Sequence, residues 1–331
     1  MYCRSLPIYH GGELVGQTPM LVPAFSGGVY DDIDKVVKFM GEFITDQVLI
    51  SAYDIHYKRV ETIPTYAKLI FIDSGGYEIS KEGDLSELGN IVVGKEKKDS
   101  KKLQKWNDEY YSKVLKEWPS DISTSHTIVV SYDHPDLRQP IEEQVANALR
   151  LWAPRSDILR ELLLKPETTA LYLPVNSIID HIELLQQFDI IGLTEKELGG
   201  STIERMVNIS RIRRAMDEKG IVRPLHIFGS LDTVSTPLYF IAGADIFDGL
   251  TWLRYSFMDG LTVYWQNYGA ITNLSTRDKQ VRSKMLVDNI HYLNVMRDEM
   301  LNYSHDKDFS HFKHHSELFK NSHDTLLARI K

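Results

Sequence analysis

The chain of 331 residues has the size of a single (β/α)8 barrel, and its 43% hydrophobic residues are enough to fill the core of such a domain. A formal net charge of −8 argues against a protein coated with basic side chains, although it leaves room for a local basic groove. Cys3 is the only cysteine, which excludes an internal disulfide and a zinc site built from several cysteines.

The hydropathy of the chain argues against a membrane protein. No stretch reaches the roughly 18 uninterrupted apolar residues that a membrane span needs. The N-terminal residues MYCRSLPIYHGG lack the apolar centre of a signal peptide. We therefore expect a cytoplasmic protein that has no membrane partner.

Residues 6–15, LPIYHGGELV, predict a β-hairpin with its turn at Gly11 and Gly12, which could plug one end of a barrel. Short apolar runs that end in polar or glycine residues follow along the chain. They predict eight buried parallel strands, at residues 20–23, 48–50, 69–72, 127–130, 170–173, 190–193, 225–228 and 244–247.

Amphipathic segments separate these runs, as is typical of helices that cover a parallel sheet. One helix is predicted near residues 33–40 and another over residues 103–118. A third begins at the capping box of Ser201 and Glu204 and ends at Gly220.

Strands that alternate with helices predict an α/β fold, and the lack of a break in composition favours one closed (β/α)8 TIM barrel over residues 1–276. From Arg277 onward the pattern is helical only, which predicts a C-terminal helical extension over residues 277–331. We expect no zinc subdomain, because one cysteine cannot supply its ligands.

Two basic clusters could form a nucleic-acid groove, although a solvated surface explains such runs equally well. One lies in a hydrophilic segment and the other on a predicted helix; they comprise Lys95, Lys97, Lys98, Lys101, Lys102 and Lys105, and Arg205, Arg211, Arg213 and Arg214. The histidines around HFKHH near the C-terminus are interpreted as part of a polar helix, because no cysteine or regularly spaced acid accompanies them.

Three acids directly follow three predicted strands: Asp73 in FIDSGGY, Asp133 in VVSYDHP and Asp248 in IFDGL. Each is also typical of a turn. In a parallel barrel, however, the C-terminal ends of all the strands meet at one mouth, where the catalytic residues lie. Carboxylates crowded into one concave site shift one another's pKa, which favours a functional site over three unrelated turns.

These residues alone leave three interpretations. The acids could hold a divalent metal through oxygen ligands. They could act on a glycosidic bond, one as nucleophile and another as proton carrier. They could also line a binding pocket without chemistry. Gly75 and Gly76 would let the backbone approach a ligand closely, and Tyr77 would supply a flat face beside it.

The motif DSGGY at residues 73–77, Asp133 after the next strand, and FDG with an arginine six positions after its aspartate (Asp248 and Arg254) resemble the tRNA-guanine transglycosylase superfamily. The order of these motifs runs through most of residues 20–255. The resemblance implies a (β/α)8 barrel that exchanges guanine in a nucleic acid for a 7-deazaguanine. It implies Asp248 as the nucleophile at C1′, which forms a covalent glycosyl-enzyme intermediate, and Asp73 as general acid or base. No metal or cofactor is expected.

The resemblance also implies the residues that hold the purine and the polymer. Asp133 would accept hydrogen bonds from the purine, and Tyr77 would stack on it. The other lining residues would be Ser74, Gly75, Gly76, Gly192, Leu193, Gly229 and, as a weak counterpart of the family's base-reading glutamine, Asn176. Arg254 and Trp252 would contact the nucleic acid. Trp252 and Tyr255 would stack on neighbouring bases, although packing in the core is the more usual role of a tryptophan beside a strand end.

Departures from the family's pattern fall on the parts that read tRNA. The bacterial and eukaryotic tRNA enzymes carry a cysteine-rich zinc site. They also have cysteine where this chain has Gly249, arginine where it has Phe257, and glutamine where it has Glu78. The chain is therefore more similar to the branch that inserts 7-deazaguanines into DNA in bacterial modification and anti-phage gene clusters, whose proteins are candidate partners. A tRNA enzyme, and a base-binding subunit without turnover, are the alternatives.

Overall fold

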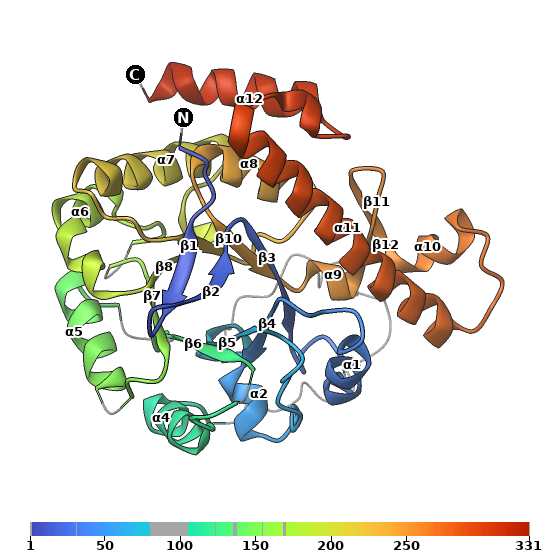
Figure 1. Ribbon diagram of the computed structural model, residues 1–331, viewed down its shortest axis with the longest axis horizontal. Helices are drawn as coiled ribbons and strands as arrows, with labels where there is room; N and C mark the ends of the chain where they lie inside the picture. Colours follow the sequence, from blue (N-terminus) through green and yellow to red (C-terminus); the bar gives the residue numbers. More distant parts are fainter. Residues whose placement is uncertain are drawn as a thin grey trace.

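The computed structural model describes residues 2–30, 32–79, 105–122, 124–134, 138–153, 155–167 and 170–330. At its centre is a closed barrel of parallel strands (Figure 1). The strands are β3 (Met20–Phe25), β4 (Gln47–Ser51), β5 (Leu69–Asp73), β6 (His126–Val130), β7 (Leu159–Leu164), β8 (Ile190–Thr194), β9 (Leu225–Phe228) and β10 (Ile246–Gly249). Strands that are consecutive in the chain lie side by side, and β10 pairs with β3 to close the barrel, so the predicted α/β barrel is confirmed.

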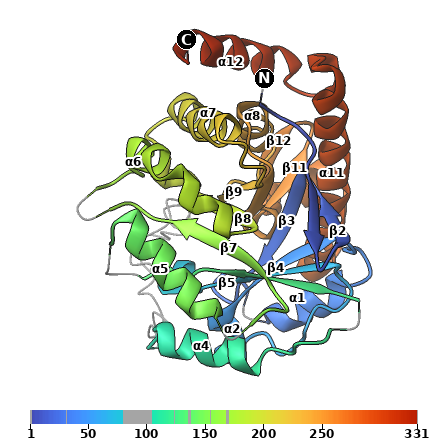
Figure 2. The same cartoon turned by 60° about the vertical axis from the view of Figure 1, so that its left-hand side comes forward.

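Helices cover the outside of this barrel (Figures 1 and 2). They are α1 (Ile33–Met40), α2 (Ala52–His56), α4 (Asp108–Glu117), α5 (Ile141–Trp152), α6 (Val175–Asp180), α7 (Thr202–Glu218) and α8 (Ser235–Ala242). The short helix α3 (Gly76–Ile79) directly follows β5. The predicted ends of α7 are confirmed. The Oγ atom of Ser201 accepts a hydrogen bond from Glu204 N at 3.3 Å, and Gly220, with φ +69°, follows the last turn as a C′ residue.

The fifth barrel strand is β7, so the prediction of a strand at residues 170–173 was wrong. Arg160 and Glu161 interrupt the apolar run LRELLL, and for this reason the run was not recognised as a buried strand. Leu159 and Leu163 point into the barrel interior. Because side chains alternate along a strand, Glu161 shares their inward face, where it is fully buried.

The hairpin plugs the barrel at the N-terminal ends of its strands. It consists of β1 (Pro7–His10) and β2 (Glu13–Gln17) and turns at the two predicted glycines. Ile8 and Val15 join the apolar cluster inside the barrel, together with Met20 and Leu69, which begin β3 and β5. The site of chemistry is therefore expected at the other end.

The C-terminal part of the chain is mostly helical, as predicted, with α11 (Asp278–Asp306) and α12 (Ser316–Arg329). The HFKHH residues lie in the connection between these helices, so their assignment to a helix was wrong. Before it, the structure adds elements that the pattern did not indicate: α9 (Thr251–Arg254), a hairpin of β11 (Tyr255–Met258) and β12 (Leu261–Tyr264), and α10 (Trp265–Ile271). Helix α11 packs on β3, α9 and β11, whereas α12 packs on α7 and α8. In this way α11 completes the outer helical layer of the barrel.

The two predicted basic clusters do not form a described basic groove. The lysines from Lys95 to Lys102 lie outside the described residues. The four arginines of α7 are each engaged by another residue, in the pairs Arg205–Glu195, Arg211–Asn176, Arg213–Asp245 and Arg214–Glu218.

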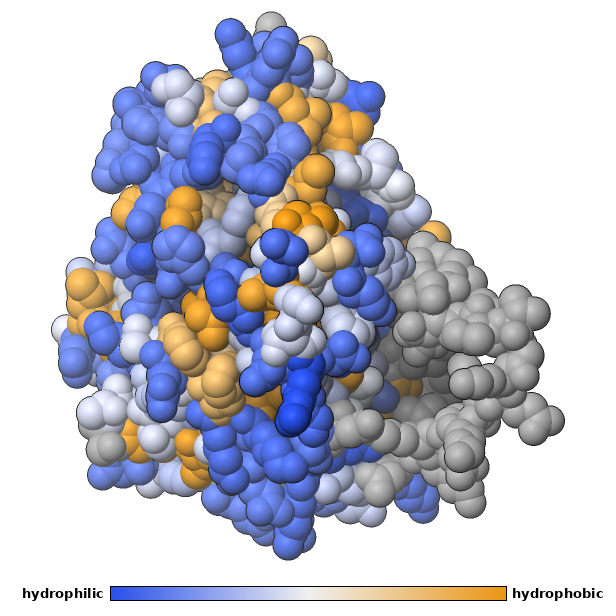
Figure 3. All heavy atoms as spheres, turned by 90° about the vertical axis from the view of Figure 1, so that its right-hand side faces the viewer, coloured by the Kyte–Doolittle hydropathy of each residue, from blue (hydrophilic) through white to orange (hydrophobic). Residues whose placement is uncertain are grey.

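The surface that carries α10 and α11 is mostly hydrophilic, with small scattered apolar areas (Figure 3). In the part of the chain that the structure describes, no helix combines the length and the hydrophobicity that a membrane span requires.

Candidate active site

The three predicted acids meet at the C-terminal end of the barrel. Asp73 is the last residue of β5, Asp248 is the second-to-last residue of β10, and Asp133 follows β6. Their side chains influence one another electrostatically, since both Asp248 and Asp133 raise the pKa of Asp73. The structure therefore brings the three carboxylates into one site.

Asp73 is suited to proton transfer near neutral pH. Burial raises its pKa to about 7, and the charges of Asp248 and Asp133 act in the same direction. The backbone N–H of Gly75, which donates to Oδ2 at 3.0 Å, opposes this effect. The residue keeps some exposed surface, so a substrate can reach it.

The glycines of the DSGG motif allow the turn after β5 to pack closely. Gly75 has φ +85°, and a Cβ atom there would lie 3.0 Å from the indole nitrogen of Trp106. A Cβ atom at Gly76 would lie 2.6 Å from Oδ2 of Asp133. The buried Ser74 accepts a hydrogen bond at its Oγ from Asp133 N at 3.2 Å. The motif therefore joins Asp133 to the end of β5.

Asp133 also lies between two cations. Its Oδ2 is 3.2 Å from Nζ of Lys165, and its Oδ1 is 3.4 Å from a guanidinium nitrogen of Arg138. Nζ of Lys165 is also 2.8 Å from Oε1 of Glu197. Lys165 directly follows β7. Because the fifth strand was predicted at residues 170–173, Lys165 was not recognised as a residue at the end of a strand. This half-buried lysine adds a donor to the site.

Asn176, the predicted counterpart of a base-reading glutamine, lies away from this site. It is the second residue of α6, and its Oδ1 accepts a hydrogen bond from Arg211 of α7 at 2.6 Å in the outer helical layer. The prediction depended on a fifth strand ending at residue 173. Because β7 ends at Leu164, Lys165 occupies the strand end instead.

Asp248 is held through one of its two oxygens. Oδ1 accepts a hydrogen bond from Gly229 N at 2.9 Å and lies 3.4 Å from Nε2 of His226. Gly229 has φ +79°, and open space surrounds the position where its Cβ would be, as expected of a pocket-lining residue. No described residue forms a hydrogen bond with Oδ2, and the side chain is 9% exposed.

A buried ion pair lies behind Asp248. Nδ1 of His226 is 2.7 Å from Oε1 of Glu161, and both side chains are fully buried. Burial lowers the pKa of His226, but the charges of Glu161 and Asp248 outweigh it and raise the pKa to about 9. Neither residue was predicted at the site: His226 lies within a run that predicts a buried strand, and the strand that carries Glu161 was not recognised.

Two predicted pocket residues on β8 belong to the packing of the barrel. A Cβ atom at Gly192 would lie 2.6 Å from the ring of Phe228 and 3.1 Å from Oε1 of Glu161, so glycine makes room for those side chains. Leu193 is buried in the outer core, and its backbone pairs with β7 and β9.

The two predicted nucleic-acid contacts differ in exposure. Trp252 is fully buried, and its indole nitrogen donates to Ala24 O at 3.0 Å, so it cannot stack on a base without leaving the core. Arg254 donates to the hydroxyl of Tyr77 at 2.5 Å. Tyr77 is 47% exposed.

Glu78 is a second protonatable carboxyl next to the site. The hydroxyls of Ser26 and Ser51 each donate to it at 2.9 Å. Burial raises its pKa to about 8, and the charges of Asp54 and Asp73 add to this effect. Glu78 is therefore largely protonated at neutral pH, where it is uncharged like a glutamine.

We expect Glu78→Gln to stabilise the protein at alkaline pH. Between pH 4.5 and about 8 the native state binds a proton at Glu78 that the unfolded state has released, so native stability falls as the pH rises through this window. Glutamine removes this loss. At pH 8.5 the variant should melt about 2 °C or more above the native protein, and at about pH 4, below the window, the two should melt together. Equal melting temperatures at both pH values would contradict a buried, protonated Glu78; the exposed Glu42→Gln variant is the control.

The metal-dependent interpretation gains no support from the described geometry. Among the residues whose placement is described, no group of three or more histidine, cysteine, aspartate or glutamate side chains is arranged to hold a metal ion.

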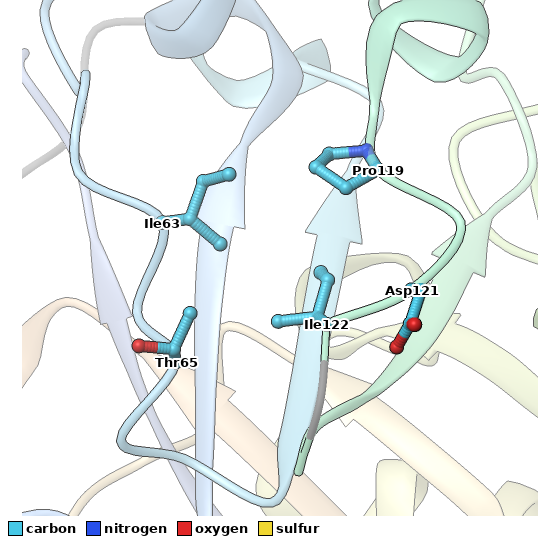
Figure 4. Close-up of a pocket in the computed structure, with 5 residues that line it drawn as sticks. All are labelled: Ile63, Thr65, Pro119, Asp121 and Ile122. Atoms are coloured by element: carbon cyan, nitrogen blue, oxygen red, sulfur yellow. The ribbon is translucent and has the colours of Figure 1, made fainter.

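A surface pocket at the other end of the barrel is not part of this site (Figure 4). Its lining residues come from the connections that precede β5 and β6, namely Ile63, Thr65, Pro119, Asp121 and Ile122. These connections lie at the N-terminal ends of the strands, whereas the three carboxylates follow the C-terminal ends.

The sequence matches no known protein-family model, and no curated protein matches it significantly. Any assignment of function therefore depends on the motifs and on the geometry of the site.

Proposed function

We propose that the chain is a guanine transglycosylase that replaces guanine in a nucleic acid, DNA in preference to tRNA, by a 7-deazaguanine such as 7-cyano-7-deazaguanine. The observation that carries this proposal is the pairing of Asp248 and Asp73. Asp248 has one oxygen held and one without a described hydrogen-bond partner. Asp73 beside it has a pKa of about 7. Together they provide a nucleophile and a proton carrier.

In the first displacement, Oδ2 of Asp248 attacks C1′ of the target nucleotide. The C1′–N9 bond breaks, and its electron pair leaves with guanine, which takes the proton of Asp73. The product is an ester between Asp248 and C1′, together with free guanine and ionised Asp73. A carboxylate nucleophile suits this oxocarbenium-like centre, as in retaining glycosidases.

In the second displacement, the incoming 7-deazaguanine gives its N9 proton to Asp73, and N9 attacks C1′. The C1′–Oδ2 bond breaks, and Asp248 regains its negative charge. Two inversions at C1′ retain the configuration of the nucleotide. Asp73 is protonated again, so the enzyme is ready for another exchange.

The base is bound by the groups around Asp133. This carboxylate can accept hydrogen bonds from N1–H and the exocyclic amine of a guanine-type base. Lys165, 3.2 Å from it, can donate to the carbonyl oxygen on the same edge of the base. Tyr77 offers its partly exposed ring for stacking. This set distinguishes guanine-type purines from adenine, which has an amine in place of the carbonyl.

The choice of DNA over tRNA follows from the resemblance and from one residue of β10 and one of β11. Positions that are cysteine and arginine in the tRNA enzymes are Gly249 and Phe257 here, and Phe257 is buried. Neither residue can replace a tRNA-reading side chain. Arg254 remains as a cation at the site.

The proposal is tested by incubating the protein with 7-cyano-7-deazaguanine labelled with carbon-14 and, separately, with duplex DNA, single-stranded DNA and unmodified tRNA. Label should enter a DNA substrate, with release of one guanine for each base incorporated. Label that entered tRNA alone would overturn the choice of polymer. Tight binding of the free base with no label in any polymer would favour a base-binding subunit without turnover.

A further inference from the structure

Behind the proposed nucleophile, three ionisable side chains form a row across the barrel. Asp248 on β10, His226 on β9 and Glu161 on β7 are linked by contacts of 3.4 Å, from Oδ1 to Nε2, and 2.7 Å, from Nδ1 to Oε1. His226 and Glu161 are fully buried. Charged side chains are rare in such an interior, because their desolvation is costly.

The surrounding packing fixes the imidazole ring of His226. The ring stacks on Phe228 with centroids 4.0 Å apart and meets Phe71 edge-on at 5.6 Å. Gly192 leaves the space that Glu161 fills. The ring therefore has little freedom to turn away from Asp248.

The stability of the fold does not explain why Asp248, His226 and Glu161 are aligned in this way. Oε2 of Glu161 and Nε2 of His226 are buried and form no hydrogen bond with any described residue. Replacing a buried ion pair by apolar residues of similar volume is often neutral or stabilising. Buried polar atoms that lack full hydrogen bonding require another explanation, and function is a common one.

We propose that His226, supported by Glu161, is a positioning residue for Asp248: together with Gly229 N–H it holds Oδ1, and it thereby leaves Oδ2 as the oxygen that attacks C1′. This inference rests on the proposed transglycosylase function. The contact of 3.4 Å between Nε2 and Oδ1 is long for a hydrogen bond and closes with a small movement of either side chain.

The charges of Asp248, His226 and Glu161 are balanced both in the free enzyme and in the covalent intermediate. In the free enzyme, Glu161 and Asp248 are the charged groups that face His226, and they raise its pKa to about 9. One positive charge then lies between two negative ones. When Asp248 becomes an ester, its charge is lost, and His226 and Glu161 remain as a neutral pair. Without Glu161, the ester would leave a lone imidazolium in an apolar interior.

The first test measures exchange by His226→Asn and Glu161→Gln. We expect kcat to fall about 100-fold in His226→Asn while KM for the incoming base stays within about twofold, because the base does not contact His226. Glu161→Gln should also lower kcat, because His226 loses the charge that keeps it protonated. The exposed His291→Asn variant should match the native protein.

A second test needs no variant and no substrate. Nitrogen-15 spectra of histidine-labelled native protein should show a fully protonated imidazolium at pH 7.5 that is absent from the His226→Asn spectrum. A neutral His226 at this pH, or unchanged kinetics in His226→Asn, would overturn the inference while exchange by the native protein still supported the proposed function. If the native protein exchanged no base, the function would fail and the positioning role with it, whatever the charge of His226.

Discussion

Replacing Asp248 by asparagine is expected to reduce base exchange by about 10⁴-fold or more, because the amide cannot form the ester on which both displacements depend. Asparagine keeps the size of the side chain and an oxygen that can accept the hydrogen bond from Gly229 N. The fold should therefore persist. Incorporation of labelled 7-deazaguanine measures the activity, and thermal unfolding checks the structure.

The matched control for this variant is Asp121→Asn, at the pocket on the far end of the barrel (Figure 4). It removes the same charge from the protein without touching the mouth, so exchange should be unchanged. If Asp248→Asn retained more than about a tenth of the native rate, Asp248 would not be the nucleophile.

Asp73→Asn is expected to slow exchange of guanine by about 10³-fold, because neither displacement has its proton carrier. In the native protein, the first displacement needs the protonated form of Asp73, so its rate should fall as the pH rises through about 7. The second displacement needs the ionised form and should slow as the pH falls through the same value. Pre-steady-state release of guanine measures the first step by itself.

A substrate that carries 7-methylguanine separates proton transfer from other effects of this variant. The methylated base is already cationic in the nucleotide, and it leaves as a neutral molecule without taking a proton. Asp73→Asn should therefore release 7-methylguanine at close to the native rate and release guanine slowly. Equal losses for the two bases would show that Asp73 acts by shaping the pocket rather than by donating a proton.

Much of the barrel could be predicted from the sequence, because most of its strands are uninterrupted apolar runs with a polar or glycine residue after them. The fifth strand could not, because Glu161 faces the interior of the barrel and breaks its run. Its position is explained only by His226, which lies 2.7 Å away but far along the chain. The residues next to Glu161 and His226 in the sequence do not indicate that these two side chains form a pair.

The same limit applies to the site. Asp73, Asp133 and Asp248 could be predicted from their positions after strands, since the barrel itself determines where they meet. Lys165 follows the strand that was missed, so it was missed as well. Trp252 lies two residues before Arg254, yet only the three-dimensional packing reveals that one is buried and the other reaches Tyr77.

The most direct measurement of the central claim is mass spectrometry of the protein after incubation with the DNA substrate, without an incoming base, followed by denaturation and proteolysis. We expect a nucleotide adduct on the peptide that contains Asp248, its loss in Asp248→Asn, and its disappearance when 7-cyano-7-deazaguanine is added before denaturation. Exchange of labelled base without any adduct on this peptide, or an adduct on another residue, would contradict the account.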